Sequence, residues 1–270
     1  MRVLHIWNTA GVGSLISKHL KRNNIDSVVL MRKGYDPFGM CEYYGDTELN
    51  MSGGSFISHA INTAKDFDII HVHGLYRIVD RLRSIYPKKK IILQHHGTEL
   101  TTGDINELIH YYKFVDEIIT STSDLNSYLN RYKIDNTLIE NAVDTELFKP
   151  IERSKFKPAL MFDIRYVDHD SSIAFAQSHC GWDINVIDRE SNHVMYSEMP
   201  IFLNQYSKFI DVKCYEWTDF NPGQAYSKTG RESLACGLDV LNYKGEIVRG
   251  LPKEFTPEYQ IKNIIDLYNR

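Results

Sequence analysis

The chain has 270 residues, 43% of them hydrophobic and 24% charged, which is long enough for two folded domains and excludes a disordered or fibrous protein. Its formal net charge of −4 gives no overall attraction for nucleic acid, so we expect no nucleic-acid partner. Four scattered cysteines, and no signal-like or membrane-spanning apolar stretch, lead us to expect a cytoplasmic protein without disulfides or zinc.

The first half of the chain alternates β-branched runs with amphipathic segments. Strands are predicted at residues 2–7, 26–31, 68–73, 90–95, 117–120 and 137–140. Helices are predicted between them, at residues 14–22, 55–65, 77–86, 105–113 and 122–131. Because strands that alternate with helices form a parallel sheet covered on both faces, residues 1–149 are predicted to be a Rossmann-like domain.

The alternation pauses at a charged segment between Pro150 and Pro158, which is typical of a linker and marks the domain boundary. Further strands are predicted at residues 159–162, 183–187, 211–215 and 239–241. Further helices are predicted at residues 171–178, 200–208, 229–236 and 257–268. Residues 150–270 are therefore predicted to form a second, smaller α/β domain, whose last helix can pack back towards the first.

The loop after the first predicted strand contains Gly11 and Gly13 and opens a helix. Such a turn lets backbone N–H groups approach an anionic ligand. The dinucleotide fingerprint, however, requires a third glycine where Ile16 stands, and an acidic residue where the second strand ends at Met31. This disfavours NAD and leaves either a loop that faces another ligand or a plain tight turn.

Histidines end two of the predicted strands, as the pairs His71 and His73, and His95 and His96. Ligands of parallel sheets bind at the carboxyl ends of strands, so these side chains are placed for function. Adjacent residues of a strand point to opposite faces, and no carboxylate stands at a supporting spacing, so we expect no metal site. Histidines that pack the loops through hydrogen bonds are the structural alternative.

A segment in the second half combines a helix start with an acidic residue. Ser227 and Thr229 can cap a helix that would carry Glu232 in its first turn. The same helix start can bind a diphosphate, while Glu232 can accept two hydrogen bonds from a ribose diol. Capping alone explains the spacing equally well.

Five segments in the same order resemble the retaining GT-B glycosyltransferases of family four (glycosyl transferases group 1). They are residues 68–74 (DIIHVHG), 94–100 (QHHGTEL), 115–123 (VDEIITSTS), 139–150 (IENAVDTELFKP) and 232–237 (ESLACG). The resemblance implies an α/β protein with two Rossmann-like domains that face a cleft. It also implies a metal-independent hexosyltransferase that uses a UDP- or GDP-sugar as substrate and requires no cofactor. The resemblance further implies that the sugar is transferred with retention to a glycan, a lipid or another acceptor.

The resemblance also assigns roles to individual residues of this chain. The residues expected to bind the donor are Arg165, Ser227, Lys228, Thr229, Gly230 and Glu232. The residues expected at the transferred sugar, as catalytic groups, are His96 and Gln224. The acceptor-side residues are Gly11, Gly13 and His73.

Two positions depart from the family pattern. Gln224 replaces the first glutamate of the E-x7-E motif, and Asp170 stands where the family has a lysine. The lost charges weaken the stabilisation of a leaving diphosphate, although Lys228 can supply a cation. The alternatives are therefore a nucleotide-sugar-binding protein that has lost turnover, or another nucleotide-sugar enzyme such as an epimerase or hydrolase.

Two short motifs are weaker signals. Asp168-His169-Asp170 matches the D-x-D pattern with which another class of glycosyltransferases holds a metal and a diphosphate, but tripeptides of this kind are common. The basic run Lys88-Lys89-Lys90 is interpreted as a solvated loop, with peripheral contact to a membrane or a phosphate as the alternative.

Overall fold

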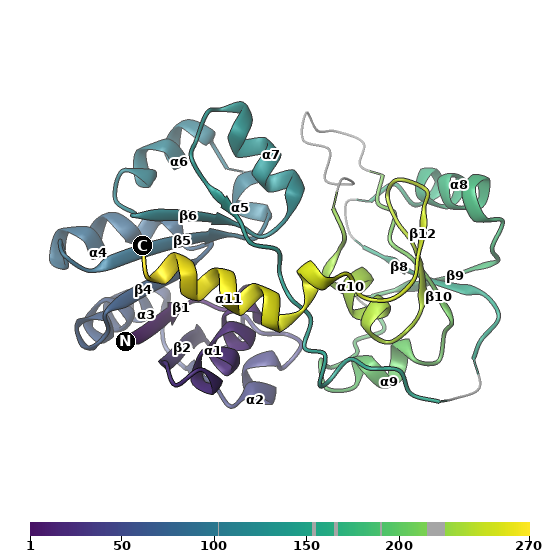
Figure 1. Ribbon diagram of the computed structural model, residues 1–270, viewed down its shortest axis with the longest axis horizontal. Coiled ribbons are helices and arrows are strands. Elements are labelled where there is room, and N and C mark those ends of the chain that lie inside the picture. The colour runs from purple at the N-terminus through teal and green to yellow at the C-terminus, as the bar shows by residue number, and fades with distance from the viewer. Residues whose placement is uncertain (102, 153–154, 165–166, 190, 215–224) are drawn as a thin grey trace. The chain divides into compact units, whose positions relative to one another are not determined.

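The computed structural model describes residues 1–101, 103–152, 155–164, 167–189, 191–214 and 225–270. The chain forms two compact units (Figure 1). The first contains Met1–Asn141 and Pro257–Arg270, and the second contains Ala142–Thr256. The division thus lies eight residues before the expected boundary at residue 149, and residues 142–149 belong to the second unit. Phe148, for example, is buried against Tyr196 of that unit.

The first unit is built on a seven-stranded parallel sheet with the order β3-β2-β1-β4-β5-β6-β7. The strands are β1 (Arg2–Ile6), β2 (Asp26–Arg32), β3 (Thr47–Leu49), β4 (Ile69–His73), β5 (Lys90–His95), β6 (Glu117–Thr120) and β7 (Thr137–Leu138). The direction of winding reverses between β1 and β4. In doubly wound sheets, the carboxyl ends of the strands at this reversal form the ligand-binding crevice.

Eight α-helices of the described residues belong to the first unit. They are α1 (Val12–Arg22), α2 (Met40–Tyr44), α3 (Gly53–Thr63), α4 (Val79–Ile85), α5 (Thr98–Thr101), α6 (Ile105–Tyr112), α7 (Ser123–Arg131) and α11 (Pro257–Tyr268). The sequence did not predict α2 and β3, because elements of three to five residues are too short to display a hydrophobic period.

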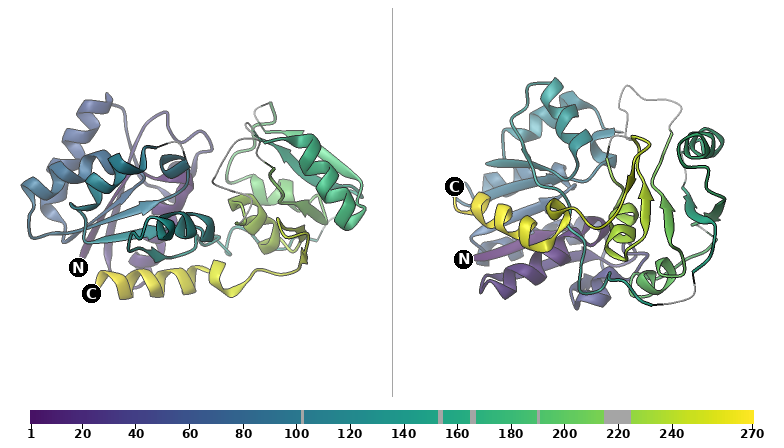
Figure 2. Two further views of the ribbon diagram at one scale, coloured as in Figure 1. Left: turned by 90° about the horizontal axis from the view of Figure 1, so that it is seen from above. Right: turned by 45° about the vertical axis from the view of Figure 1, so that its right-hand side comes forward.

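The terminal helix α11 packs on the first unit, beside α1 (Figure 2). Its residues Ile261, Ile264 and Leu267 are buried in the core between these helices and the sheet. Lys90 of β5 donates a hydrogen bond to the carbonyl of Leu267 at 2.5 Å, which satisfies one backbone acceptor at the end of the helix. The helix predicted at residues 257–268 thus packs back on the first domain as expected, and because its apolar face covers the first sheet, these residues belong to the first unit and not to the second domain.

The second unit has a five-stranded sheet with the order β12-β11-β10-β8-β9, in which only β12 is antiparallel to its neighbour. Its strands are β8 (Ala159–Asp163), β9 (Ile184–Asp188), β10 (Lys208–Ile210), β11 (Asp239–Leu241) and β12 (Ile247–Val248). Its α-helices within the described residues are α8 (His169–Cys180), α9 (Met199–Leu203) and α10 (Lys228–Ala235). The predicted α/β class of both halves is confirmed.

Two predicted elements of the second unit were wrong in extent. The helix predicted at residues 200–208 ends at Leu203, because the buried Asn204 side chain donates to the carbonyls of Lys149 and Pro200 at 3.1 and 2.8 Å. The strand predicted at residues 211–215 lies earlier, at β10. This shift leaves Asp211 just after the strand.

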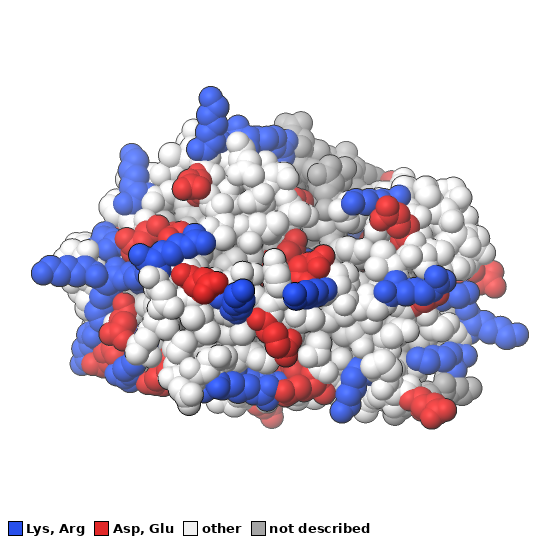
Figure 3. Space-filling model, in the orientation of Figure 1, with Lys and Arg blue, Asp and Glu red and all other residues white. Residues whose placement is uncertain are grey.

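One face of the molecule shows how the charged side chains are distributed. On the face shown in Figure 3, lysine and arginine side chains are interspersed with aspartate and glutamate, so this face presents mixed charge and no basic stripe. None of the helices in the described parts of the chain is long and apolar enough to cross a membrane.

Candidate functional site

Polar side chains replace apolar ones towards the carboxyl ends of four neighbouring strands in the first unit. Alternate residues of a strand share a face. The apolar residues on one face are Val3, Ile69, Ile92 and Ile119. The polar residues that follow them are His5, His71, His73, Gln94 and Ser121, all of them buried. Sequence analysis missed His5, which pairs in register with His71. The available signal was a histidine in an otherwise apolar strand.

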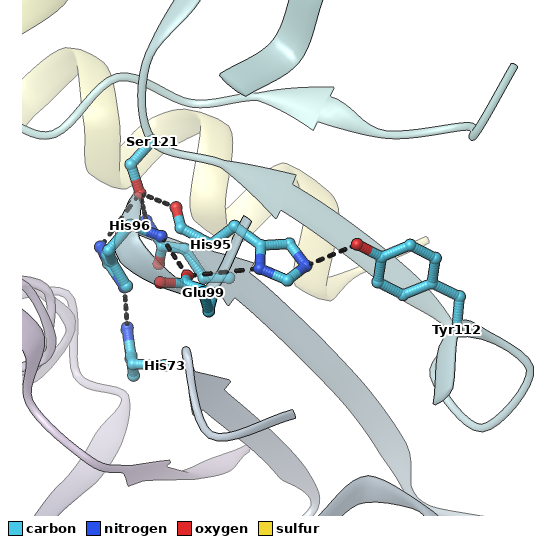
Figure 4. A network of polar contacts seen from close by, with 7 residues as sticks. His73, His95, His96, Glu99, Tyr112 and Ser121 are labelled. Carbon is cyan, nitrogen blue, oxygen red and sulfur yellow. Dashed lines mark hydrogen bonds and ion pairs between the residues drawn. The ribbon is translucent and has the colours of Figure 1, made fainter. Parts of the chain in front are cut away.

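A chain of hydrogen bonds links these strand ends (Figure 4). His5 Nδ1 and His73 Nε2 are 2.9 Å apart, and His73 Nδ1 and His96 Nε2 are 3.1 Å apart. His96 Nδ1 lies 3.1 Å from the hydroxyl of Ser121, which donates to the carbonyl of His95 at 2.6 Å. Both ring nitrogens of the predicted catalytic residue His96 are therefore engaged, so contact with a sugar requires one of these bonds to be exchanged.

Glu99, which sequence analysis did not single out, holds the same loop. Its Oε1 atom accepts a hydrogen bond from the backbone N–H of His96 at 2.6 Å and lies 3.3 Å from His95 Nδ1. The other nitrogen of His95 is hydrogen-bonded to Tyr112 at 3.0 Å (Figure 4). Burial alone would raise the pKa of Glu99, but the interactions with His95 and His96 outweigh it and lower the pKa to about 2. Glu99 is therefore a fixed negative charge at the strand ends.

Burial keeps the neighbouring histidines neutral. Desolvation lowers the pKa of His96 to about 4, although the charge of Glu99 opposes the change. Desolvation also holds the pKa of His73 well below its usual value, with smaller contributions from the adjacent histidines. Neutral imidazoles can donate or accept hydrogen bonds at neutral pH, but they supply no positive charge to a leaving group.

The predicted glycine loop lies against this network. A Cβ atom on Gly13 would lie 3.2 Å from Asn8 Oδ1, which is tight, and in ordinary contact with His73 Nε2 at 3.4 Å, so Gly13 lies next to the strand end. Gly11 has φ +73°, and the non-glycine residues Trp7 and Ala10 also have positive φ, at 75° and 51°. Left-handed non-glycine residues store strain and cluster at functional sites. Of the three residues expected on the acceptor side, Gly13 and His73 thus lie close together, whereas Gly11 lies against Met40.

A pocket of about 390 Å³ opens beside these residues, entirely within the first unit. Its polar side chains are those of Tyr76, Arg77, Glu99, Asp104 and Glu107. Arg77 pairs with Glu107 through two hydrogen bonds of 2.8 and 2.9 Å. Carboxylates accept hydrogen bonds from hydroxyl groups, and an aromatic ring offers an apolar face, so the pocket suits a polyhydroxylated ligand.

In the second unit, four of the predicted donor residues lie at the start of α10. Ser227 is the N-cap residue, and its hydroxyl accepts a hydrogen bond from the backbone N–H of Gly230 at 2.9 Å. Asp211 accepts a hydrogen bond from the backbone N–H of Ser227 at 2.8 Å. A Cβ atom on Gly230 would overlap the Asp211 carboxylate, so this position requires glycine. A carboxylate is thus already present at the helix start.

Glu232 is the fifth residue of α10, because the helix begins at Lys228, one residue earlier than predicted. It therefore lies outside the first turn, where a capping role would place it, and its residue exposure is only 3%. Its Oε1 atom pairs with Lys228 Nζ at 3.3 Å but has no hydrogen-bond partner among the described residues. Burial raises the pKa of Glu232, while Lys228 and Arg189 oppose the rise. The ion pair with Lys228 offsets part of the cost of burying this carboxylate, and hydrogen bonds from the hydroxyl groups of a ligand would offset more of it.

Arg189 is a second cation near Glu232 that sequence analysis missed. It follows β9 directly, and its Nη1 atom donates a hydrogen bond to the hydroxyl of Thr229 at 3.0 Å. Its guanidinium lies over the ring of Phe162, 5.0 Å from the centroid. Burial lowers the pKa of Arg189, and Glu232 opposes the change. The rule that identified the histidines, a polar residue at a strand end, could have found it.

Three further predicted residues have different outcomes. Arg165 and Gln224 lie outside the described residues. Asp168 is the N-cap residue of α8, where its carboxylate accepts hydrogen bonds from the backbone N–H and the hydroxyl of Ser171 at 3.0 and 2.6 Å. The first half of the D-x-D motif therefore has a structural role.

Two Rossmann-like units in one chain, each built on a mainly parallel sheet, are the architecture of the GT-B fold. The chain is similar to a putative UDP-N-acetylglucosamine 2-epimerase from Listeria monocytogenes, with 14% identity, a TM-score of 0.51 and coverage of 100% of this chain and 88% of that one. It is also similar to S. aureus MnaA in complex with UDP, with 10% identity, a TM-score of 0.50 and coverage of 100% and 88%.

The UDP-GlcNAc 2-epimerase from Neisseria meningitidis, bound to UDP-GlcNAc, aligns with 14% identity, a TM-score of 0.48 and coverage of 100% and 92%. No protein-family model and no curated protein matches the chain. At these identities, the first two similarities establish the fold, while the chemistry has to be argued from the residues.

Proposed function

We propose that the protein is a retaining glycosyltransferase of family four that binds a UDP- or GDP-sugar through its second unit. The observation that carries the proposal is the buried carboxylate of Glu232, which lies near Lys228 and Arg189 at the start of α10. The carboxylate can accept hydrogen bonds from a ribose diol. The two cations and the helix start can stabilise the negative charge that develops as the diphosphate leaves.

In this proposal, the acceptor binds to the first unit, in the pocket next to Glu99. The carboxylates of this pocket orient the hydroxyl groups of a glycan-like acceptor. His96 lies at the edge of the same strand ends and provides a neutral hydrogen-bonding group for the transferred sugar. Correct placement of the two reactants accounts for a large part of the rate enhancement in such a reaction.

The donor site is tested by calorimetric titration of UDP and GDP into wild-type protein and the Glu232→Gln variant. Loss of hydrogen bonds to a charged group costs about 1.5–3 kcal/mol, so affinity should fall roughly tenfold to a hundredfold. Glu254→Gln, at an exposed position of the same unit, is the matched control and should bind as the wild type does. Unchanged affinity in Glu232→Gln for every nucleotide that binds the wild type would reject this role of Glu232.

The reaction is tested with a panel of UDP- and GDP-sugars, a mixture of glycan and lipid acceptors, and mass spectrometry of the products. We expect a glycosylated acceptor, and we expect the rate to be the same when EDTA is added together with the donor, because protein cations neutralise the diphosphate. An epimerised or hydrolysed donor would replace the proposal with the corresponding enzyme class.

A protein that binds nucleotide sugars without turnover is the second candidate, and Asp211 favours it. This carboxylate accepts a hydrogen bond at the start of α10, where a diphosphate would otherwise find the positive end of the helix. If Asp211 opposes the diphosphate, Asp211→Asn should bind UDP or GDP more tightly than the wild type. A gain in affinity without any transfer product from either protein would establish this candidate.

A further inference from the structure

Three histidines of the first unit meet on one face of its sheet, at the point where the winding reverses. His5 of β1 pairs in register with His71 of β4, and His73 lies two residues further along β4. Residues two apart share a face of the strand. All three residues have an exposure of 0%. A His-x-His strand next to a strand with a third histidine therefore directs three imidazoles into one buried volume.

The distances in this cluster are close to those of a metal site. One ring nitrogen from each of His5, His71 and His73 lies within 4.8 Å of the others. Zinc binds histidine nitrogen at about 2.0–2.1 Å with tetrahedral geometry, which places ligand nitrogens about 3.3 Å apart. His5 Nδ1 and His73 Nε2 are 2.9 Å apart and share a hydrogen bond, so a bound metal replaces this bond and draws the His71 nitrogen in from as far as 4.8 Å.

The cluster also contains buried polar atoms that lack partners. Among the residues that the structure describes, His71 Nε2 and Gln94 Oε1 have no hydrogen-bond partner. Gln94 pairs in register with His73 from the neighbouring strand β5. A metal ion bound by His71 Nε2 and Gln94 Oε1 would satisfy both of these buried atoms.

The remaining nitrogens are held as in protein metal sites. His71 Nδ1 is hydrogen-bonded to the hydroxyl of Tyr268 at 2.7 Å, and His73 Nδ1 to His96 Nε2 at 3.1 Å. Histidines that bind metals usually have their second nitrogen fixed in this way, which orients the ring. The amide nitrogen of Gln94 donates to Ser121 at 3.1 Å, so its oxygen is turned away from Ser121.

We propose that His5, His71 and His73 bind one zinc ion, with Gln94 Oε1 as the fourth ligand. Three imidazoles and one amide oxygen suit zinc, whereas magnesium and calcium prefer sites made entirely of oxygen. The ion stabilises the first unit by joining β1, β4 and β5. It takes no part in binding the donor, so this proposal stands independently of the proposed function.

The test is the metal content of the full-length protein, purified from zinc-supplemented medium and dialysed against metal-free buffer. Mass spectrometry of the elements should find about one zinc per chain. Removal of the metal with a strong chelator after mild acid treatment should lower the melting temperature, and added zinc should restore it. Cobalt added to the metal-free protein should give the intense visible absorption of a tetrahedral site.

His71→Asn and His73→Asn should each reduce the zinc content at least fivefold. His59→Gln, at an exposed histidine of α3, is the control for adventitious surface zinc and should leave the content unchanged. Because a ligand variant can fail to fold, the wild-type titration decides independently. No bound zinc in the wild type and no saturable uptake by the metal-free protein would overturn the proposal, as would full zinc content in a folded His73→Asn variant.

Discussion

Glu99→Gln should destabilise the protein strongly at neutral pH and much less in acid. The pKa of Glu99 falls from 4.5 to about 2 on folding, a difference of about 2.5 units, which corresponds to about 3 kcal/mol. The side chain is only 13% exposed, so solvent screens little of this contribution. Since the folded pKa is the lower one, the stabilisation is complete above pH 4.5 and is lost as the pH falls towards 2. At pH 3, about 1.4 kcal/mol should remain.

The measurement is urea unfolding of the wild type and Glu99→Gln at pH 7 and pH 3, followed by circular dichroism. Glu107→Gln is the matched control, because Glu107 lines the same pocket but forms a solvent-exposed pair with Arg77. Screening by water should make its effect small. The reasoning fails if Glu99→Gln is as stable as the wild type at pH 7, or if the difference between them does not shrink in acid.

Three further variants test other parts of the structure. His96→Ala should lower kcat more than it weakens nucleoside-diphosphate affinity, and equal losses in steady-state kinetics and calorimetry would indicate a structural role instead. Gly230→Ala should cost about 1–3 kcal/mol in urea unfolding, because the added Cβ overlaps Asp211, and wild-type stability would contradict that contact. Ile264→Ala should lower the unfolding free energy by about 2–5 kcal/mol, and a negligible loss would mean that α11 does not complete the core.

The sequence determined the fold class and the positions of most strands. Residues 68–73 and 90–95 form continuous apolar runs that end in polar side chains, which is typical of buried parallel strands. Their order along the chain, with helices between them, is sufficient to predict a parallel sheet. Strand polarity then placed His73 and His96 at one edge, so part of the candidate site in the first unit followed from local pattern alone.

Only the tertiary structure decided which distant residues share a site. Hydrophobic periodicity shows that α11 has an apolar face but does not say which sheet that face covers, and packing placed it against α1. In the same way, no local pattern links His5 to His71 or Arg189 to Thr229. The strand order brings the first pair together, and the packing of α10 near the end of β9 brings the second pair together. Burial is likewise a property of the whole fold. It raises the pKa of Glu232 and lowers the pKa of His96, which keeps His96 neutral. In both cases the physical reason is the removal of water by residues far away in the sequence.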